Sequence, residues 1–204
     1  MKQRSLVVVS AGLSQPSSTR LLADRLSAAA VDAAAGLGVT LDVRVIELRD
    51  LAHDITDHLL TGFPPAALKD ALAAVAAADG LIAVTPVFNA SYSGLFKSFF
   101  DVVDKDSLDD KPVLLAATGG TARHSLALEH ALRPMFAYLH AVTVPTSVFA
   151  ASEDWGGDEA EGQLHGRILR GAGELAREVA RRDPAEVTDP FALTTSFEEL
   201  LAGR

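Results

Sequence analysis

The sequence predicts an α/β domain in which a parallel sheet is covered by helices on both faces. Five strand segments alternate with five helical segments, and most of the strands are continuous apolar runs. Such runs are typical of parallel strands that are buried on both faces. Three loops rich in Gly, Ser, Thr and Asn each follow a buried strand, so we expect them to converge on one site at the carboxyl edge of the sheet.

Length and composition favour one domain. A chain of 204 residues buries roughly 70% of the surface that its unfolded form exposes. Hydrophobic residues make up 49% of the chain and aromatic residues only 6%, so the core is built from Ala, Val and Leu. No apolar run is long enough for a membrane span or a signal peptide, and we therefore expect a soluble, cytoplasmic protein.

Several classes of function are excluded by residue counts. The chain has no cysteine, so disulfides, thiolate catalysis and Cys-based metal sites are absent, and redox chemistry needs a bound cofactor. The net charge of −9 argues against nucleic acid or an anionic membrane as the main partner. The histidines lack zinc-ligand spacing, and no metal site is predicted.

The first half of the chain contains two strands and two helices. An apolar strand at 6–11 leads into a helix at 18–35. The alternating segment 39–46 is the second strand and reads as a sheet edge. Residues 47–63 are expected to be irregular, and a helix follows at 66–78, with proline just before it, where a missing N–H costs nothing.

The second half repeats the alternation and ends in a tail. Strands are predicted at 81–85, 112–118 and 141–148, and helices at 93–103, 124–139 and 159–182. Residues 1–182 thus form the domain, and 183–204 a C-terminal tail. We expect the tail to pack on the domain or on a neighbouring subunit, the alternative being a partly disordered end. Its apolar residues are Phe191, Leu193, Phe197, Leu200 and Leu201.

The loop after the first strand is the first candidate site. It has neither the lysine of a Walker motif nor the glycines of a dinucleotide fingerprint. Its hydroxyl groups suit a phosphate monoester, since helix N-termini bind anions and Arg20 lies behind them. The simpler alternative is that Ser17 or Ser18 is only a helix N-cap. The candidate phosphate ligands are Ser10, Ser14, Ser17, Ser18 and Thr19.

The three loops together resemble those of the flavodoxin-like NAD(P)H-dependent FMN reductases. The resemblance rests on SAGLSQPSSTR at 10–20, TPVFNASYSGLFKSFFD at 85–101 and ATGGTARHSLALEHALRP at 117–134. The chain is most similar to the branch that partners luciferase-like flavin-dependent monooxygenases. This resemblance implies a flavodoxin-like three-layer sandwich whose five-stranded parallel sheet has the order 2-1-3-4-5, with helices on both faces.

The resemblance also implies an FMN site. It places the FMN phosphate on the hydroxyl-rich first loop and the flavin ring between the second and third loops. Along the ring and ribityl chain it places Pro86, Val87, Phe88 and Asn89. At the polar edge of the ring it places Thr118, Gly119, Gly120 and Thr121. Arg123 and His124 are the candidates for binding NAD(P)H.

Two positions depart from the family pattern. Many relatives have an acidic residue and a tyrosine where this chain has Val87 and Phe88, and several have an arginine near Leu13 or Ser14. The first change removes polar contacts near the ring. The second leaves the phosphate charge to Arg20 or to backbone amides alone.

The implied function is hydride transfer from NADH or NADPH to FMN, which supplies reduced flavin to a monooxygenase. Family members imply a homodimer or homotetramer. The alternatives are an FMN-dependent quinone or azo-compound reductase, a flavodoxin-like electron carrier without a nicotinamide site, and a cofactor-free interaction domain. Trp155 is interpreted as a packing anchor, or alternatively as a cover for the flavin.

Overall fold

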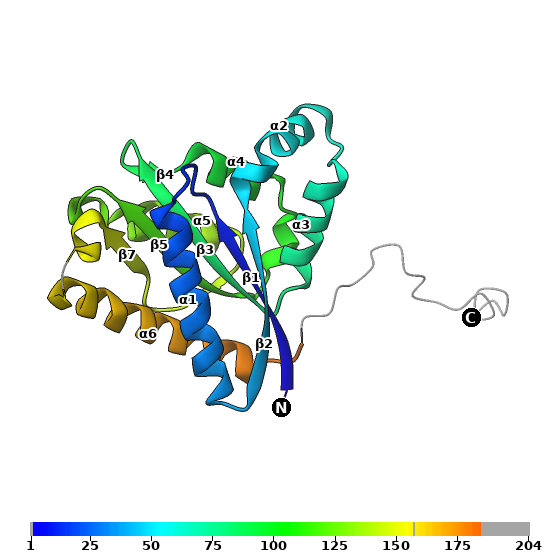
Figure 1. The fold of residues 1–204 in the computed structure, drawn as a ribbon. Helices are drawn as coiled ribbons and strands as arrows, with labels where there is room; N and C mark the ends of the chain where they lie inside the picture. The colour runs from blue at the N-terminus through cyan, green and yellow to red at the C-terminus, as the bar shows by residue number, and fades with distance from the viewer. Residues whose placement is uncertain (1, 157, 185–204) are drawn as a thin grey trace, which may run out of the picture.

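The computed structural model describes residues 2–156 and 158–184 as three layers (Figure 1). Parallel strands form the middle layer in the order β2-β1-β3-β5, and β6 and β7 both pair with the far side of β5. This confirms the predicted 2-1-3-4-5 order, with a short antiparallel β4 added beside β3. The strands are β1 (Lys2–Ser10), β2 (Val39–Glu47), β3 (Gly80–Phe88), β4 (Ser91–Tyr92), β5 (Pro112–Gly119), β6 (Val142–Thr143) and β7 (Val148–Ala151).

Helices cover both faces of the sheet because strand side chains alternate between two apolar clusters. In β1, Leu6 and Val8 pack with α1 and α6, whereas Val7 and Val9 pack with the helices of the opposite face. The two buried faces leave polar chemistry to the strand ends. The helices are α1 (Ser18–Ala35), α2 (Ala52–Thr61), α3 (Ala66–Ala77), α4 (Gly94–Val102), α5 (Arg133–Tyr138) and α6 (Asp158–Arg181).

The predicted tail lies almost wholly outside the described residues. Only 183 and 184 belong to the described part, so the expected packing of residues 185–204 stays a prediction. Across 2–156 and 158–184, no helix combines the length and apolar character that crossing a membrane requires.

The prediction that 47–63 is irregular was wrong. A 3-10 turn at Leu48–Leu51 leads into α2, which ends at Gly62 with a left-handed φ of 78°. Ile55 is its one fully buried residue, and its other residues are partly buried or exposed. The helix begins after Leu51, which makes no side-chain cap hydrogen bond, so the sequence has no capping residue that marks its start.

The helix predicted at 124–139 was also wrong in part. The structure has a 3-10 turn at Ala122–His124, a π-helical turn at Leu128–Leu132 and then the short α5. Pro134 has no N–H with which to continue an α-helical ladder. The Arg133 N–H bonds the Leu128 carbonyl, five residues back, so the ladder widens just before the proline.

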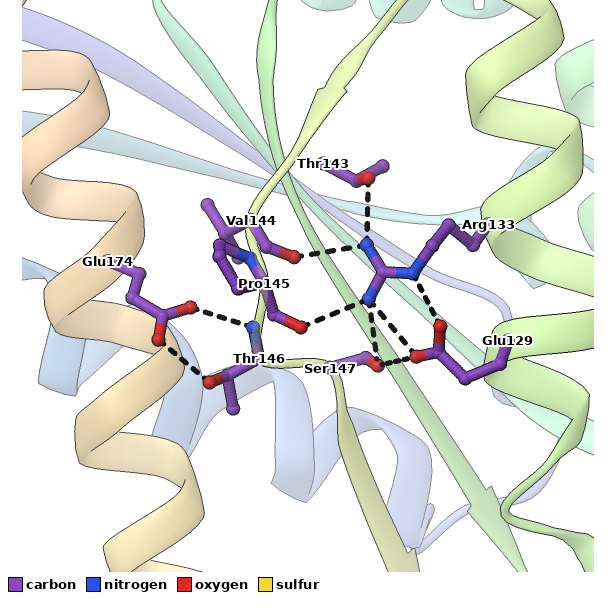
Figure 2. A network of polar contacts seen from close by, with 8 residues as sticks. All are labelled: Glu129, Arg133, Thr143, Val144, Pro145, Thr146, Ser147 and Glu174. Carbon is purple, nitrogen blue, oxygen red and sulfur yellow. Dashed lines mark hydrogen bonds and ion pairs between the residues drawn. The ribbon is translucent and has the colours of Figure 1, made fainter.

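The predicted strand 141–148 is split into β6 and β7. The Val144 N–H still donates to the Val113 carbonyl of β5 at 2.9 Å, but residues 145–147 leave the sheet, and Pro145 has no N–H to donate to a neighbouring strand. Side chains from both helical layers hold this segment (Figure 2). Glu174 of α6 accepts from the Thr146 N–H at 2.7 Å and its hydroxyl at 2.8 Å. On the other side, Arg133 donates to Thr143 Oγ1, the carbonyls of Val144 and Pro145, Ser147 Oγ and Glu129.

A buried lysine closes the amino edge of the sheet. The Lys111 ammonium is 2.8 Å from each of the carbonyl oxygens of Val75, Ala76 and Ala78, which lie at the end of α3. These carbonyls have no partner within the helix, so the lysine acts as a C-cap. Burial lowers the pKa of Lys111 to about 8, against the attraction of the Asp79 carboxylate.

This pKa predicts a pH dependence of stability. Between pH 8 and the ordinary value of 10.5, the unfolded chain holds the Lys111 proton and the folded chain does not. The free energy of unfolding therefore rises with pH across this window. Across this window, the free energy of unfolding of the wild type should rise by up to about 3 kcal/mol more than that of Lys111→Met. Urea unfolding of both proteins from pH 7 to 10.5 measures this difference. Parallel pH profiles of the two free energies of unfolding would contradict the prediction.

Candidate functional site

Three strands end together at the carboxyl edge of the sheet. Ser10, the last residue of β1, is in register with Val84 of β3, and Pro86 of β3 is in register with Thr118 of β5. The loops that follow β1, β3 and β5 therefore emerge at the same edge, above the start of α1 (Figure 1). The structure thus brings the three predicted loops to one edge of the molecule.

The first loop ends in a capped helix N-terminus. Ser17 is the N-cap of α1, and its Oγ accepts from the Arg20 N–H at 3.2 Å. The capping role proposed for Ser17 is therefore confirmed. The Ser18 and Thr19 amides have no acceptor within the helix, because the first N–H groups of a helix never do. The first turn carries no acidic residue, so it remains suited to an anion.

A buried hydroxyl lies at the end of β1. Ser10 is fully buried, and its Oγ has no hydrogen-bond partner among the described residues. Unpaired buried hydroxyls are rare, since each loses its bonds to water without replacement. This donor points to a group that the protein alone does not supply. The other two serines of the loop, Ser14 and Ser18, are exposed.

Arg20 is occupied by the protein itself. Its guanidinium donates to Asp24 at 2.8 Å and also to Glu47. These two carboxylates, Asp24 first, raise the pKa of Arg20 and neutralise its charge. Arg49 is a second cation at this loop, with Nη1 3.5 Å from the Leu13 carbonyl oxygen and Nε 3.5 Å from Asp50. Sequence reasoning missed Arg49 because it lies in the stretch expected to be irregular.

The second loop is a hairpin between β3 and β4. Thr85 Oγ1 accepts from the Ser93 N–H at 3.0 Å and donates to the Pro86 carbonyl at 2.9 Å, which fixes the base of the loop. Asn89 and Ala90 form its tip, with φ of 49° and 69°. Two positive φ values in a row are those that a tight hairpin turn requires.

The predicted flavin contacts of this loop therefore differ in exposure. Pro86 is buried within the sheet, and Val87 is partly buried. Phe88 is 46% exposed, so its ring lies free at the edge of the site. Asn89 is an exposed turn residue.

The third loop has two glycines in different surroundings. A Cβ on Gly119 would lie 2.8 Å from Phe149 Cζ, whereas a Cβ on Gly120 would meet nothing within 4 Å. Thr121 caps the next turn, and its Oγ1 accepts from the Arg123 N–H at 3.3 Å. The Thr118 hydroxyl is buried and lies 2.8 Å from Thr19 Oγ1.

Residues predicted at the mouth of the site have mixed outcomes. Arg123 and His124 are exposed, as expected, but they lie in a 3-10 turn and not at the start of an α-helix. Trp155 packs on the apolar cluster of α1 and α6, 5.1 Å from the Arg25 guanidinium, which confirms the packing anchor. Within the ranges that the structure describes, no group of three or more His, Asp or Glu residues could hold a metal ion.

Gly12 allows a test of the first loop. A Cβ on Gly12 would lie 2.1 Å from Ser17 Oγ and 3.2 Å from Thr19 Cβ, so alanine must displace the helix cap. Gly12→Ala should lower the free energy of unfolding by about 2 kcal/mol. Gly120→Ala, with open space around it, is the matched control. Urea unfolding measures both, and equal effects would show that crowding at Gly12 is not the cause.

Comparisons with known proteins identify the family. Residues 4–156 match the family model described as NADPH-dependent FMN reductase. An FMN reductase (NADPH) of Pseudomonas aeruginosa is 43% identical over 150 residues, which cover 74% of this chain and 78% of that protein. The NADH-dependent FMN reductase SfnF of Pseudomonas fluorescens is 38% identical over 175 residues, which cover 86% of this chain and 89% of that protein.

Solved structures agree with these relatives. An oxidoreductase of Corynebacterium diphtheriae is 48% identical with a TM-score of 0.86, and the match covers 90% of this chain and all of that one. The apo form of the NADH:FMN oxidoreductase EmoB is 33% identical with a TM-score of 0.72, and the match covers 83% of this chain and 88% of that one. The chain therefore belongs to the NADPH-dependent FMN reductase family and is an NAD(P)H-dependent FMN oxidoreductase.

Proposed function

We propose that this enzyme binds FMN across the carboxyl ends of β1, β3 and β5 and releases reduced flavin to a monooxygenase. The observation that carries the proposed site is the buried Ser10 hydroxyl without a partner, at the end of β1. It lies at the strand end that leads to the free amides of α1. A phosphate monoester bound there gives these donors the acceptors that they lack.

The donor set of the first loop fits the FMN phosphate. The Ser18 and Thr19 amides are free of intrahelical bonds, and the Ser14 and Ser18 hydroxyls are exposed. Gly12 has no side chain, so the loop closes tightly over Ser17 Oγ. These groups are neutral. Of the two arginines near the loop, Arg20 pairs with two carboxylates, whereas Arg49 pairs with one, Asp50, and also reaches the Leu13 carbonyl. The phosphate is thus held mainly by hydrogen bonds.

The other two loops fit the flavin ring. Val87 and the exposed ring of Phe88 offer apolar surface, and the open space beside Gly120 leaves room for a flat ligand to approach the backbone. Backbone N–H groups of the 119–121 turn can bond the polar edge of the ring and stabilise negative charge on it. This arrangement favours a site that binds and orients flavin without a protein nucleophile.

The chemistry is hydride transfer from NAD(P)H, and bound FMN supplies the acceptor. The chain's residues bind and orient the two ligands. Arg123 is exposed at the mouth of the site and is suited to the 2′-phosphate of NADPH. His124 lies beside it in the same turn and is suited to stacking or hydrogen bonding with the nucleotide.

Release of the flavin follows from the same donor set. A phosphate held by neutral donors binds less tightly than one held by a bidentate arginine. We therefore infer that FMN is exchanged as a substrate and not held permanently. The resemblance to reductases that partner monooxygenases supports this role. A cytoplasmic location and a homodimer or homotetramer stay predictions of the sequence.

The proposed function is tested by following absorbance at 340 nm with NADPH or NADH, with and without added FMN. We expect oxidation that depends on FMN, and a coupled monooxygenase should then consume the reduced flavin. Arg123→Ala should raise the KM for NADPH about 10-fold and leave the KM for NADH within about twofold. Turnover that needs an azo dye or quinone, with no flavin released, would instead make the protein a reductase of those acceptors.

Replacing the buried Ser10 hydroxyl should raise the stability of the apoprotein and lower the affinity for FMN. Ser10→Ala removes an unpaired polar group, so the apoprotein should become more stable, by about 1 kcal/mol. The same change removes a donor to the phosphate, so FMN affinity should fall by about 2 kcal/mol. Urea unfolding and quenching of flavin fluorescence measure the two effects. A loss of apoprotein stability with unchanged FMN affinity would give Ser10 a purely structural role.

The two arginines at the first loop predict different outcomes. Arg49→Met should weaken FMN binding about 10-fold, because it removes the arginine whose charge is offset by one carboxylate, Asp50, and not by two. Arg20→Met is the control and should leave FMN affinity within about threefold, since Asp24 and Glu47 already neutralise that charge. Fluorescence titration measures the FMN affinity of both variants. A larger loss of affinity in Arg20→Met than in Arg49→Met would show that Arg20 is the arginine that interacts with the phosphate.

A further inference from the structure

A buried hydrogen bond connects the first turn of α1 with the end of β5, beside the first and third loops. Thr19 Oγ1 and Thr118 Oγ1 are 2.8 Å apart, although the residues are 99 positions apart in the chain. The exposed fractions of the two residues are only 2% and 4%. Thr19 lies in the first turn of α1, and Thr118 lies near the end of β5, in register with Pro86 of β3. The bond therefore bridges from α1 to β5, with β3 between β1 and β5.

The two hydroxyls satisfy each other. One donates and the other accepts, so at most one of the two hydroxyl protons is left for a ligand. A hydrogen bond of this length in a buried position is stronger than one at the surface. Both threonines were predicted from the resemblance to be FMN ligands, and this bond gives them a different task.

We propose that Thr19 and Thr118 are positioning residues that fix the spacing between the phosphate-binding turn and the turn at Gly119 and Gly120. This inference rests on the proposed FMN site. One FMN molecule must reach both turns, so its affinity depends on their separation. The sheet alone fixes the strands, but the loops beyond them need side-chain contacts to hold their positions.

The start of α1 is held from two sides. On one side Arg20 bonds Glu47, the last residue of the edge strand β2. On the other side Thr19 bonds Thr118 of β5. The arginine contact is partly exposed, with 36% and 25% of the two side chains accessible, whereas the threonine bond is buried. The threonine bond therefore contributes more to the position of this turn. Loss of the threonine bond removes the buried side-chain hydrogen bond between this turn and β5.

A double-mutant cycle on FMN affinity tests the proposal. Thr19→Val and Thr118→Val each replace the hydroxyl by a methyl group of similar size. Each should weaken FMN binding about 10-fold, and the double variant should show the same loss of about 10-fold, because one shared bond is broken in all three. Fluorescence quenching of free FMN gives the three dissociation constants.

The alternative outcomes separate the competing roles. If each hydroxyl binds FMN directly, the losses multiply to about 100-fold in the double variant, and the proposal is overturned. Unchanged affinity in the single variants also overturns it, since the bond is then only structural. A wild type that does not bind FMN contradicts the proposed function itself, and the positioning role falls with it.

Two control measurements distinguish loss of the hydrogen bond from other effects of the substitutions. Thr19→Ser and Thr118→Ser keep the hydroxyls and should retain FMN affinity within about threefold, whereas a 10-fold loss would overturn the proposal. In the apoprotein, the cycle should show a coupling of about fivefold in the unfolding equilibrium constant, and no coupling would mean that the bond does not form. If a valine variant does not fold, the alanine variants complete the same cycle.

Discussion

Burial of both faces of the parallel sheet is the constraint on which the rest of the molecule depends. Strand β1 has neighbours on both sides and apolar clusters above and below, so none of its interior positions can carry a ligand-binding group. Polar chemistry is confined to the strand ends, where the backbone leaves the sheet. At the amino end, the polar group of Lys111 has a structural role, since it bonds the carbonyls at the end of α3. At the carboxyl end it is left open at Ser10 and the first turn of α1.

The fold could be predicted from the sequence because strands that are buried on both faces appear as continuous apolar runs. Continuous apolar runs gave the positions of β1, β3 and β5, and the loops after them were identified by their small and hydroxylic residues. The errors fell where burial is slight or where proline interrupts a pattern. α2 buries only Ile55 fully and begins after Leu51 without a capping side chain, so the sequence does not mark its start. Pro134 and Pro145 lie inside the helix predicted at 124–139 and the strand predicted at 141–148, and the structure interrupts both elements near these prolines.

The candidate site was predictable at the level of loops and not of single side chains. A hydroxyl group in a sequence gives no indication of whether it will bond a ligand or another protein group. Ser17 caps a helix, Thr121 caps a turn and Thr19 bonds Thr118, while Ser10 stays without a partner. Arg20 presented the same problem, since the carboxylate of Glu47 that occupies it is 27 positions away in the sequence. These pairings exist only once the sheet has brought its strand ends together.

Neutral donors at the phosphate loop also reconcile an acidic protein with an anionic ligand. The chain has a net charge of −9, so long-range attraction does not bring a phosphate to it. Recognition must come from short-range hydrogen bonds, which salt screens only weakly when they are buried. Such bonds depend on geometry more than on charge, because each donor must meet its acceptor at about 3 Å. A site of this kind is only as good as the separation of its loops, and a contact that fixes this separation therefore matters as much as a direct ligand.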